Sequence, residues 1–162
     1  EGMDISADSA AYVREELKIP VSVGTIDGVD YPPASFDIIT MWHFLEHARE
    51  PDQYIEKARR WLKPDGILVV DVPNYMGTDA RKMWNHWTGW SLPYHFYHFT
   101  PETLKQLLAK QSFRTIRHKD YLSEHVKERL EHLFFPKPFA RLIARFYSGH
   151  SFAVVAQKNG KQ

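Results

Sequence analysis

The stretch from residue 35 to residue 74 constrains the fold of this 162-residue chain more than any other. It opens on a short, nearly continuous apolar run at 36–41 with β-branched residues, a pattern typical of a strand covered on both faces. A helical pattern over 51–62 follows and ends at the Lys-Pro-Asp-Gly sequence of 63–66. A second apolar run occupies 67–72. The stretch therefore predicts one β-α-β unit of a parallel sheet.

Strands and helices alternate on both sides of this unit as well. On the N-terminal side, the patterns predict the end of a strand at Met3–Ile5, a helix capped by Ser6 with Ala10, Val13 and Leu17 inward, and a short strand at 21–23. On the C-terminal side, they predict a helix opening at Thr100, a strand at 113–119, one or two helices within 123–147, and an antiparallel last strand at 151–158. The alternation predicts an α/β fold with a mostly parallel sheet.

Composition indicates one globular domain over residues 1–162. Hydrophobic residues make up 43% of the chain and aromatic residues 14%, which excludes a disordered class. The formal net charge of +1, from 21 basic and 20 acidic residues, predicts no nucleic-acid partner. The sequence has no cysteine, and so no disulfide or thiolate nucleophile, which agrees with a cytoplasmic location. No apolar run approaches the roughly 20 residues of a membrane span.

Several short segments lie just past the ends of the predicted strands: Asp4, Gly24 to Asp27, Trp42 to His47, and Pro73-Asn74. In open parallel sheets ligands bind outside the carboxyl ends of the strands. We therefore expect these residues to line one edge of the sheet. Asp4 is the most informative of them, because an acidic residue at this place can accept both hydroxyls of a ribose. Alternatively, Asp4 caps the helix that starts at Ala7.

An ordered set of short motifs gives the chain a resemblance to a known family. The motifs are MDIS at 3–6, GTID at 24–27, SFD at 35–37, LEH at 45–47, LKPDG at 62–66, PN at 73–74 and PYHFYHFTPETL at 93–104. In this order and spacing, the chain resembles the class I S-adenosylmethionine-dependent methyltransferases, nearest to the branch around the ubiquinone-biosynthesis O-methyltransferases and related bacterial enzymes. The resemblance implies a Rossmann-like sheet and S-adenosylmethionine as cofactor. It also implies methyl transfer to a small-molecule or lipid-linked, glycolipid-like acceptor, at oxygen by family habit.

The resemblance further implies which residues contact the cofactor. The implied contacts are the ribose with Asp4, the adenine with Thr25, Ile26 and Asp27, and the methionine part with Met41, Trp42 and His43. A simple turn at 24–27 is the alternative for the adenine segment.

One feature departs from the family pattern. The family's GxGxG loop after its first strand is absent, and the chain opens where the second strand should be ending. We therefore expect a chain that is N-terminally truncated relative to the family and inactive as it stands. Without that first strand, the run at 36–41 would expose unpaired backbone groups, which predicts either a homodimer paired through this edge or a rearranged sheet.

The residues His43, Glu46 and His47 also suit a metal site, since a glutamate beside two histidines is chemically able to bind zinc. A histidine at a strand-to-helix turn is more often a capping or substrate-orienting group. The sequence prediction is therefore that no metal is bound.

The connection at 75–99 is long and dense in aromatic residues, which predicts a lid over the acceptor pocket. His95 and His98 lie within it, and a neutral imidazole there could take a proton from the acceptor hydroxyl. Alternatively, the aromatic residues belong to the core, with His98 hydrogen-bonded to the backbone before Thr100. Because methyl transfer chiefly needs an in-line approach in a dry site, a dedicated base is not required.

The segment 130–147, inside the predicted helical insertion of 123–147, combines a broad apolar face with Lys137, Arg141 and Arg145. Such a face suits peripheral contact with a membrane surface or with a lipid-like substrate. An ordinary helical cover between the last two strands is the alternative.

Two rival functions come from other classes. One is a non-catalytic interaction domain that keeps the fold without the cofactor. The other is a nicotinamide-dependent oxidoreductase, which is disfavoured because the sequence lacks the glycine fingerprint of that class and any Tyr-x-x-x-Lys. Titration with each cofactor separates these functions.

Overall fold

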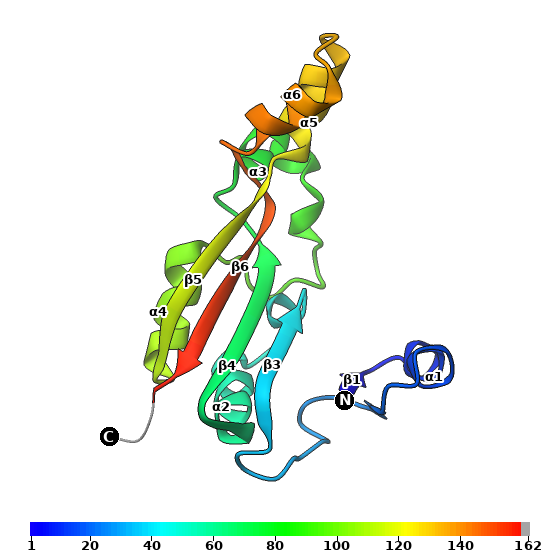
Figure 1. Ribbon diagram of the computed structural model, residues 1–162, viewed down its shortest axis with the longest axis vertical. Helices are drawn as coiled ribbons and strands as arrows, with labels where there is room; N and C mark the ends of the chain where they lie inside the picture. The colour runs from blue at the N-terminus through cyan, green and yellow to red at the C-terminus, as the bar shows by residue number, and fades with distance from the viewer. Residues whose placement is uncertain (160–162) are drawn as a thin grey trace.

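The computed structural model describes residues 1–159, in which the strands form two separate sheets (Figure 1). The small sheet pairs β1 (Gly2–Asp4) with β2 (Val21–Val23) in parallel. The main sheet has the order β3-β4-β6-β5, formed by β3 (Phe36–Trp42), β4 (Leu62–Pro73), β5 (Phe113–Leu122) and β6 (Ser148–Lys158). The strands predicted at 3–5 and 21–23 are thus separated from the strand predicted at 36–41, instead of sharing one sheet with it.

Strand direction in the main sheet agrees with the predicted fold class. β3 and β4 are parallel, with Trp42 opposite Asp71, and helix α2 (Pro51–Trp61) connects them as the predicted β-α-β unit. β6 runs antiparallel to both β4 and β5, so it alone opposes the direction of the other strands in this sheet. The α/β, Rossmann-like class with an antiparallel last strand is confirmed.

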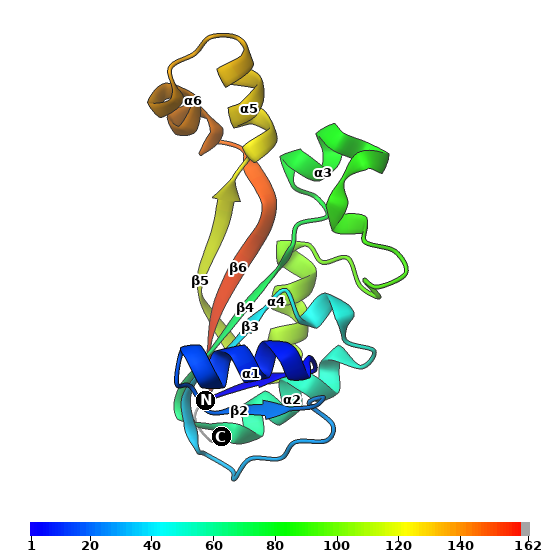
Figure 2. The same ribbon diagram turned by 90° about the vertical axis from the view of Figure 1, so that its right-hand side faces the viewer.

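The core lies between the main sheet and two helices on one of its faces, α2 and α4 (Pro101–Lys110) (Figure 2). Thr100 and Thr103 form a capping box that fixes the start of α4. The two helices and the sheet bury Ile55, Ala58, Leu68, Val70, Leu104, Leu108, Phe152 and Val154. Each fully buried aliphatic side chain of this kind contributes about 1.5–3 kcal/mol of hydrophobic free energy.

The prediction that β3 is covered on both faces is wrong. Ile39 and Met41 pack toward the core, but Ile38 on the opposite face is 60% exposed and Trp42 is 56% exposed. Covered and exposed residues therefore alternate from Ile38 to Trp42 in β3, although nearly all of them are apolar. The helix α1 (Ala7–Glu16) packs on β1 and β2, so the face of β3 that carries Ile38 and Trp42 stays open. β4 also begins at Leu62, earlier than the predicted 67.

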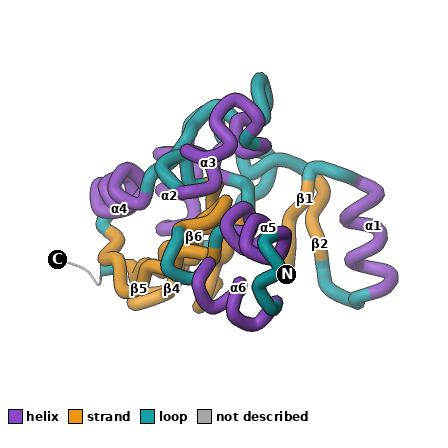
Figure 3. Tube along the Cα trace, turned by 90° about the horizontal axis from the view of Figure 1, so that it is seen from above, coloured by secondary structure: helices purple, strands orange, loops and turns teal. Residues whose placement is uncertain are grey.

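The N-terminal strands and α1 lie beside the main sheet rather than on it (Figure 3). Ser6 caps α1 as predicted, since its Oγ accepts from the Ser9 N–H at 3.2 Å. Ala10 is buried, whereas Leu17, predicted to point inward, is 55% exposed. A two-stranded sheet is too small to cover the whole apolar side of the helix.

The strands β5 and β6 extend beyond the rest of the main sheet and carry helices at their ends. α5 (Glu124–His132) and α6 (Lys137–Ala144) occupy 123–147, and α3 (Thr78–Met83) packs against β6 and α5. The connection at 75–99 contains α3 and two 3-10 turns, η2 (Trp84–His86) and η3 (Thr88–Trp90). Among the described residues, no helix combines the length and apolar character that crossing a membrane requires.

Candidate functional site

A cleft of about 730 Å³ separates the small sheet from β3. Its lining includes β1, the turn after β2 and much of β3, so the cleft runs along β3 and reaches the strand ends where the rule for parallel sheets places ligands. Of the residues predicted to bind cofactor, the cleft is lined by Asp4, Thr25, Ile26, Met41, Trp42 and His43. The volume is that of a site for a nucleoside-sized ligand.

A second hollow, of about 690 Å³, lies over α2 and is lined by Gln53, Glu56, Lys57, Arg59, Arg60 and Lys158. None of the residues predicted to bind cofactor lines it. The cleft between the sheets is therefore the stronger candidate.

At the end of β1, Asp4 combines a turn contact with a free oxygen. Its Oδ1 accepts from the Ser6 N–H at 2.7 Å, which closes a turn before α1, whereas the cap of that helix is Ser6 and not Asp4. The Asp4 backbone carbonyl accepts from the Gly24 N–H at 2.9 Å. The second carboxylate oxygen makes no hydrogen bond to the described residues. It can therefore accept from a ligand in the cleft.

The turn after β2 is fixed to α2 by polar contacts. The Lys57 ammonium donates to the Ile26 carbonyl at 2.8 Å, and the Tyr54 hydroxyl donates to Asp27 at 3.0 Å. Ile26 is buried against the cleft, and Thr25 is exposed at its rim. Asp27 faces α2 and does not line the cleft, unlike its predicted neighbours.

His43, directly after β3, lies between two buried carboxylates. Its Nδ1 is 3.2 Å from Glu46 Oε1 and its Nε2 is 3.3 Å from Asp71 Oδ1. The hydrogen bond with Glu46, helped by the charges of Glu46 and Asp71, raises the pKa of His43 although burial opposes it. Burial raises the pKa of Asp71, and burial together with the hydrogen bond to Asp71 raises the pKa of Tyr121 to about 12.

The two histidines predicted as bases, His95 and His98, do not line the cleft. His95 Nδ1 lies 2.8 Å from the Gly89 carbonyl, and His98 Nε2 lies 3.2 Å from the Trp90 carbonyl. The His98 contact matches the alternative of a backbone-bonded histidine. Each ring keeps one nitrogen for another partner.

The sequence prediction placed His47 at this edge and among possible metal ligands, but gave it no role in binding cofactor or acceptor. This side chain lines the cleft, and its ring centroid is 4.6 Å from that of His95. His47 thereby connects the aromatic connection to the cleft. The LEH motif pointed to His47 itself, but nothing local in the sequence pairs it with His95.

The aromatic connection at 75–99 divides into buried and exposed parts. Trp87 is buried, and its Nε1–H donates to His150 Nδ1 at 3.0 Å. Trp84 is exposed, and Trp90, partly buried, donates to the Trp84 carbonyl at 2.8 Å. One tryptophan thus anchors the segment while another is open to solvent, so the lid stays a prediction.

Known proteins resemble the chain in sequence and in structure. The sequence profile of a family described as methyltransferase domain matches residues 1–119. A curated relative from Mycolicibacterium smegmatis, named "Probable S-adenosylmethionine-dependent methyltransferase", is 27% identical over 74 residues, which are 45% of this chain and 29% of the relative. The match thus spans less than a third of the relative's length.

Solved structures show the same fold at low sequence identity. A SAM-dependent methyltransferase from Archaeoglobus fulgidus has a TM-score of 0.67 and 19% identity, covering 97% of this chain and 75% of that one. The 1,6-didemethyltoxoflavin-N1-methyltransferase of Burkholderia thailandensis, solved with bound 1,6-didemethyltoxoflavin and S-adenosylhomocysteine, has a TM-score of 0.60 and 18% identity, covering 97% of this chain and 60% of that one. Since the family profile covers well over half of the sequence, the chain belongs to the methyltransferase-domain family and has the fold of S-adenosylmethionine-dependent methyltransferases.

Proposed function

We propose that this protein transfers a methyl group from S-adenosylmethionine to a hydroxyl group of a small-molecule or glycolipid-like acceptor. The observation that carries the proposal is the cleft, which gathers Asp4, Ile26 and Trp42 from three separate strand ends. The cofactor is supported by relatives whose names specify S-adenosylmethionine and by one relative solved with S-adenosylhomocysteine.

The residues of the cleft suit the successive parts of this cofactor. The free oxygen of Asp4 would accept the ribose hydroxyls, and the apolar side chain of Ile26 would lie against the adenine, with the Thr25 hydroxyl near its amine. The exposed indole of Trp42 suits the cationic sulfonium, because aromatic faces attract cations. Backbone groups at Met41 to His43 would hold the methionine part.

The chemistry needs little beyond positioning. Transfer from a sulfonium is an in-line displacement, so holding the acceptor oxygen against the methyl carbon in a dry site supplies most of the rate enhancement. His95 and His98 each retain one ring nitrogen that could accept the hydroxyl proton. Of the two, His95 is nearer the cleft, since its ring contacts that of His47.

The glycolipid-like acceptor is supported by the surface at the tip of the molecule. Phe134 is 96% exposed and Phe146 is 83% exposed, so the segment 130–147 does not use these side chains as an ordinary core cover. The cationic side chains of Lys137, Arg141 and Arg145 lie exposed beside them. Exposed aromatic rings with neighbouring cations are typical of segments that contact anionic lipid surfaces.

Isothermal titration of the protein with S-adenosylmethionine, S-adenosylhomocysteine and NAD tests the proposed cofactor. We expect binding heat with S-adenosylmethionine and with S-adenosylhomocysteine, and none with NAD. Asp4→Ala should lower the affinity for both at least tenfold, because a hydrogen bond to a charged group contributes about 1.5–3 kcal/mol. Asp8→Ala, which removes an exposed carboxylate from the first turn of α1, is the matched control. Binding of NAD instead would support the oxidoreductase, and binding of neither would support the interaction domain.

Because β3 is an edge strand of the main sheet and forms one wall of the cleft, the proposal includes weak cofactor affinity and low turnover for this chain. Mixing the protein with vesicles of neutral and of anionic lipid tests the acceptor class. We expect sedimentation with anionic vesicles, and loss of it in Phe134→Ser/Phe146→Ser. Equal recovery of both proteins in the supernatant would remove the support for a lipid-linked acceptor.

A further inference from the structure

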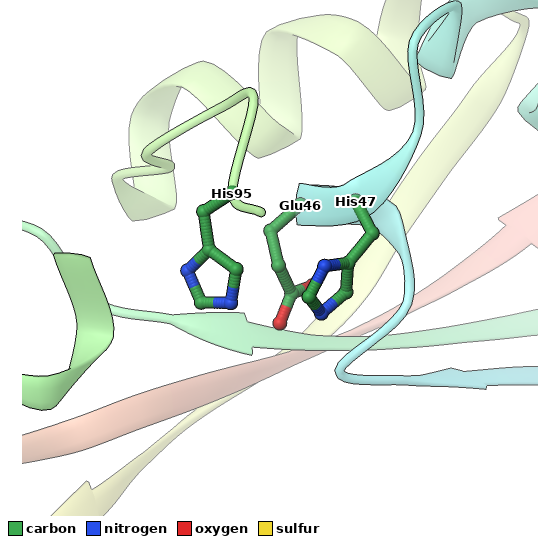
Figure 4. Close-up of side chains that lie close together, drawn as sticks. All are labelled: Glu46, His47 and His95. Atoms are coloured by element: carbon green, nitrogen blue, oxygen red, sulfur yellow. The ribbon is translucent and has the colours of Figure 1, made fainter. Parts of the chain in front are cut away.

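We propose that Glu46, His47 and His95 form a binding site for a divalent first-row transition-metal ion, with Zn²⁺ as the best match. One ligand atom from each of the three side chains lies within 4.8 Å of the other two, and Figure 4 shows the side chains converging. This spread is close enough for small side-chain adjustments to place all three atoms around one ion.

Both histidine rings are oriented as metal ligands usually are. His47 Nδ1 lies 3.0 Å from the Tyr94 carbonyl, and His95 Nδ1 lies 2.8 Å from the Gly89 carbonyl. A carbonyl can only accept, so each Nδ1 carries the proton and each Nε2 keeps its lone pair. A backbone carbonyl on the remote nitrogen is the arrangement that holds most metal-binding histidines in place.

Glu46 provides an independent observation that points to a missing cation. Its side chain is 1% exposed, and Oε1 is engaged by His43 Nδ1 at 3.2 Å. Oε2 is buried and has no hydrogen-bond partner among the described residues. Leaving a buried polar group unpaired is unfavourable, more so for a charged one, so such an atom requires an explanation. An ion bound at Oε2 would provide the missing partner.

The fold holds the two chain segments of the site together. Glu46 and His47 belong to the 3-10 turn η1 (Leu45–His47), and the Glu46 carbonyl accepts from the Phe96 N–H at 2.9 Å and from the Tyr97 N–H at 3.3 Å. These bonds fix His95, the preceding residue, beside the turn. His43, which the sequence suggested as a partner of Glu46 and His47, supports Glu46 instead, because both of its ring nitrogens face carboxylates.

The donor set selects the class of metal. Two imidazoles and one carboxylate suit Zn²⁺ and its first-row neighbours, whereas Mg²⁺ and Ca²⁺ prefer oxygen ligands throughout. Three protein ligands leave at least one position open, as in catalytic zinc sites. Because His47 lines the cleft, that position can face an acceptor hydroxyl; this last step rests on the proposed methyltransferase function. If His95 binds a metal through Nε2, that nitrogen cannot also accept the proton of the acceptor hydroxyl.

Titration of chelator-treated protein with Co²⁺, followed by visible absorption, and competition by Zn²⁺ test the site without any enzyme assay. We expect one ion per chain, and a loss of affinity of at least about 100-fold in His95→Ala and in Glu46→Gln. Glu46→Gln keeps the side-chain shape and removes only the anionic ligand, and its thermal unfolding should lose the Zn²⁺-dependent increase in Tm seen for the wild type. His86→Ala, an exposed histidine of the same connection, is the matched control and should bind as the wild type does.

Wild-type stoichiometry well below one, or equal affinity in the wild type and in Glu46→Gln, would overturn the site. An equal loss in His86→Ala and His95→Ala would do so as well, since it would show adventitious binding by histidines in general. Repeating the S-adenosylmethionine titration with and without Zn²⁺ keeps the two proposals separate. Metal binding by a protein that binds no cofactor would overturn the proposed function and leave the metal site standing.

Discussion

The main sheet and the N-terminal unit, residues 1–35, differ in what holds them. The buried core is built from β3 onward, and no member of this cluster comes from the N-terminal unit. The unit contacts α2 and β3 through a few side chains: the Trp61 Nε1–H donates to Asp30 at 3.0 Å, and the Tyr31 ring packs edge-on against Phe36 and Trp61. The cleft lies between the two regions. One of its walls is β3, which belongs to the packed main sheet, and the other is the N-terminal unit, which is held by few contacts.

We therefore expect stability and cofactor binding to depend on separate parts of this molecule. Burial of apolar area dominates the stability of the main sheet, whereas the polar links set the position of Asp4 and Thr25 across the cleft. Damage to the first region should unfold the protein. Substitutions that break the links of the N-terminal unit should displace its side of the cleft and leave the main sheet folded.

The largest effect is expected from truncating the core. Leu68 is fully buried in the centre of the main sheet, so Leu68→Ala should lower the free energy of unfolding by about 2–5 kcal/mol through lost burial and a residual cavity. Leu17→Ala, at the exposed end of α1, removes the same atoms and should change it by less than about 0.5 kcal/mol. Urea unfolding followed by circular dichroism measures both. Similar losses in the two variants would contradict the division into two regions.

A smaller and local effect is expected from breaking a link. Trp61→Phe removes the donor to Asp30 but keeps an aromatic ring in the same buried position. We expect backbone amides of β1 and β2 to exchange about tenfold faster with solvent, while amides of β4 and β6 keep their protection. Hydrogen exchange read by mass spectrometry resolves these segments. Faster exchange throughout the chain would show that the two regions unfold as one.

The sequence predicted the main sheet well because its signals are local. The apolar runs, Thr100 and the Lys-Pro-Asp-Gly sequence each specify structure within a few residues, and the class of fold follows from their order. Exposure was harder to predict. Ile38, Trp42 and Leu17 are apolar residues on open faces, and only the neighbours brought by the tertiary fold decide which apolar positions are covered.

The candidate site was predicted only in part, because some of its residues follow from local signals and others are brought together by the tertiary fold. Residues that follow strands could be placed at one edge by a general rule. Asp4 and Trp42 do line one cleft, whereas Asp27 and Asn74, placed by the same rule, do not. The cluster of Glu46, His47 and His95 could not, because two of its members are adjacent and the third comes from a distant segment. Its assembly depends on backbone bonds from Phe96 and Tyr97 to Glu46, which no local pattern encodes.

The open edge of β3 provides a third test, with an effect of several-fold on an equilibrium. Exposed strand edges pair with other chains, so we expect a concentration-dependent homodimer through this edge. Because β3 also lines the cleft, a second chain paired with β3 should compete with the cofactor. Ile38→Lys places a charge on the open face and should weaken self-association several-fold. Gln53→Lys adds the same charge on the exposed side of α2 and should not. Light scattering over a concentration series decides; a monomer at every concentration would contradict the edge-paired dimer.

The smallest effect concerns pH and the anchor of the aromatic connection, Trp87 on His150. Trp87 Nε1–H donates to His150 Nδ1, so the ring must be neutral at that nitrogen. Burial, and then the nearby His43, lower the pKa of His150 below its usual value near 6.5. Below pH 6.5 the unfolded chain therefore binds a proton that the folded chain resists. The contribution of neutral His150 to the free energy of unfolding is therefore complete above pH 6.5, and it is lost as the pH falls from 6.5 through the lowered pKa of the folded state.

Replacing the ring by a group that accepts without titrating isolates this contribution. His150→Asn can still accept from Trp87 and should lack the loss of stability between pH 7.5 and pH 5, whereas His86→Asn, at an exposed site, should behave as the wild type. One hydrogen bond contributes about 1 kcal/mol, so the wild type should lose only about 2–4 °C of Tm relative to His150→Asn over this range. Thermal unfolding followed by tryptophan fluorescence at the two pH values measures it. If the difference in Tm between the two proteins is the same at both, His150 does not titrate in this way and the Trp87 anchor is insensitive to pH.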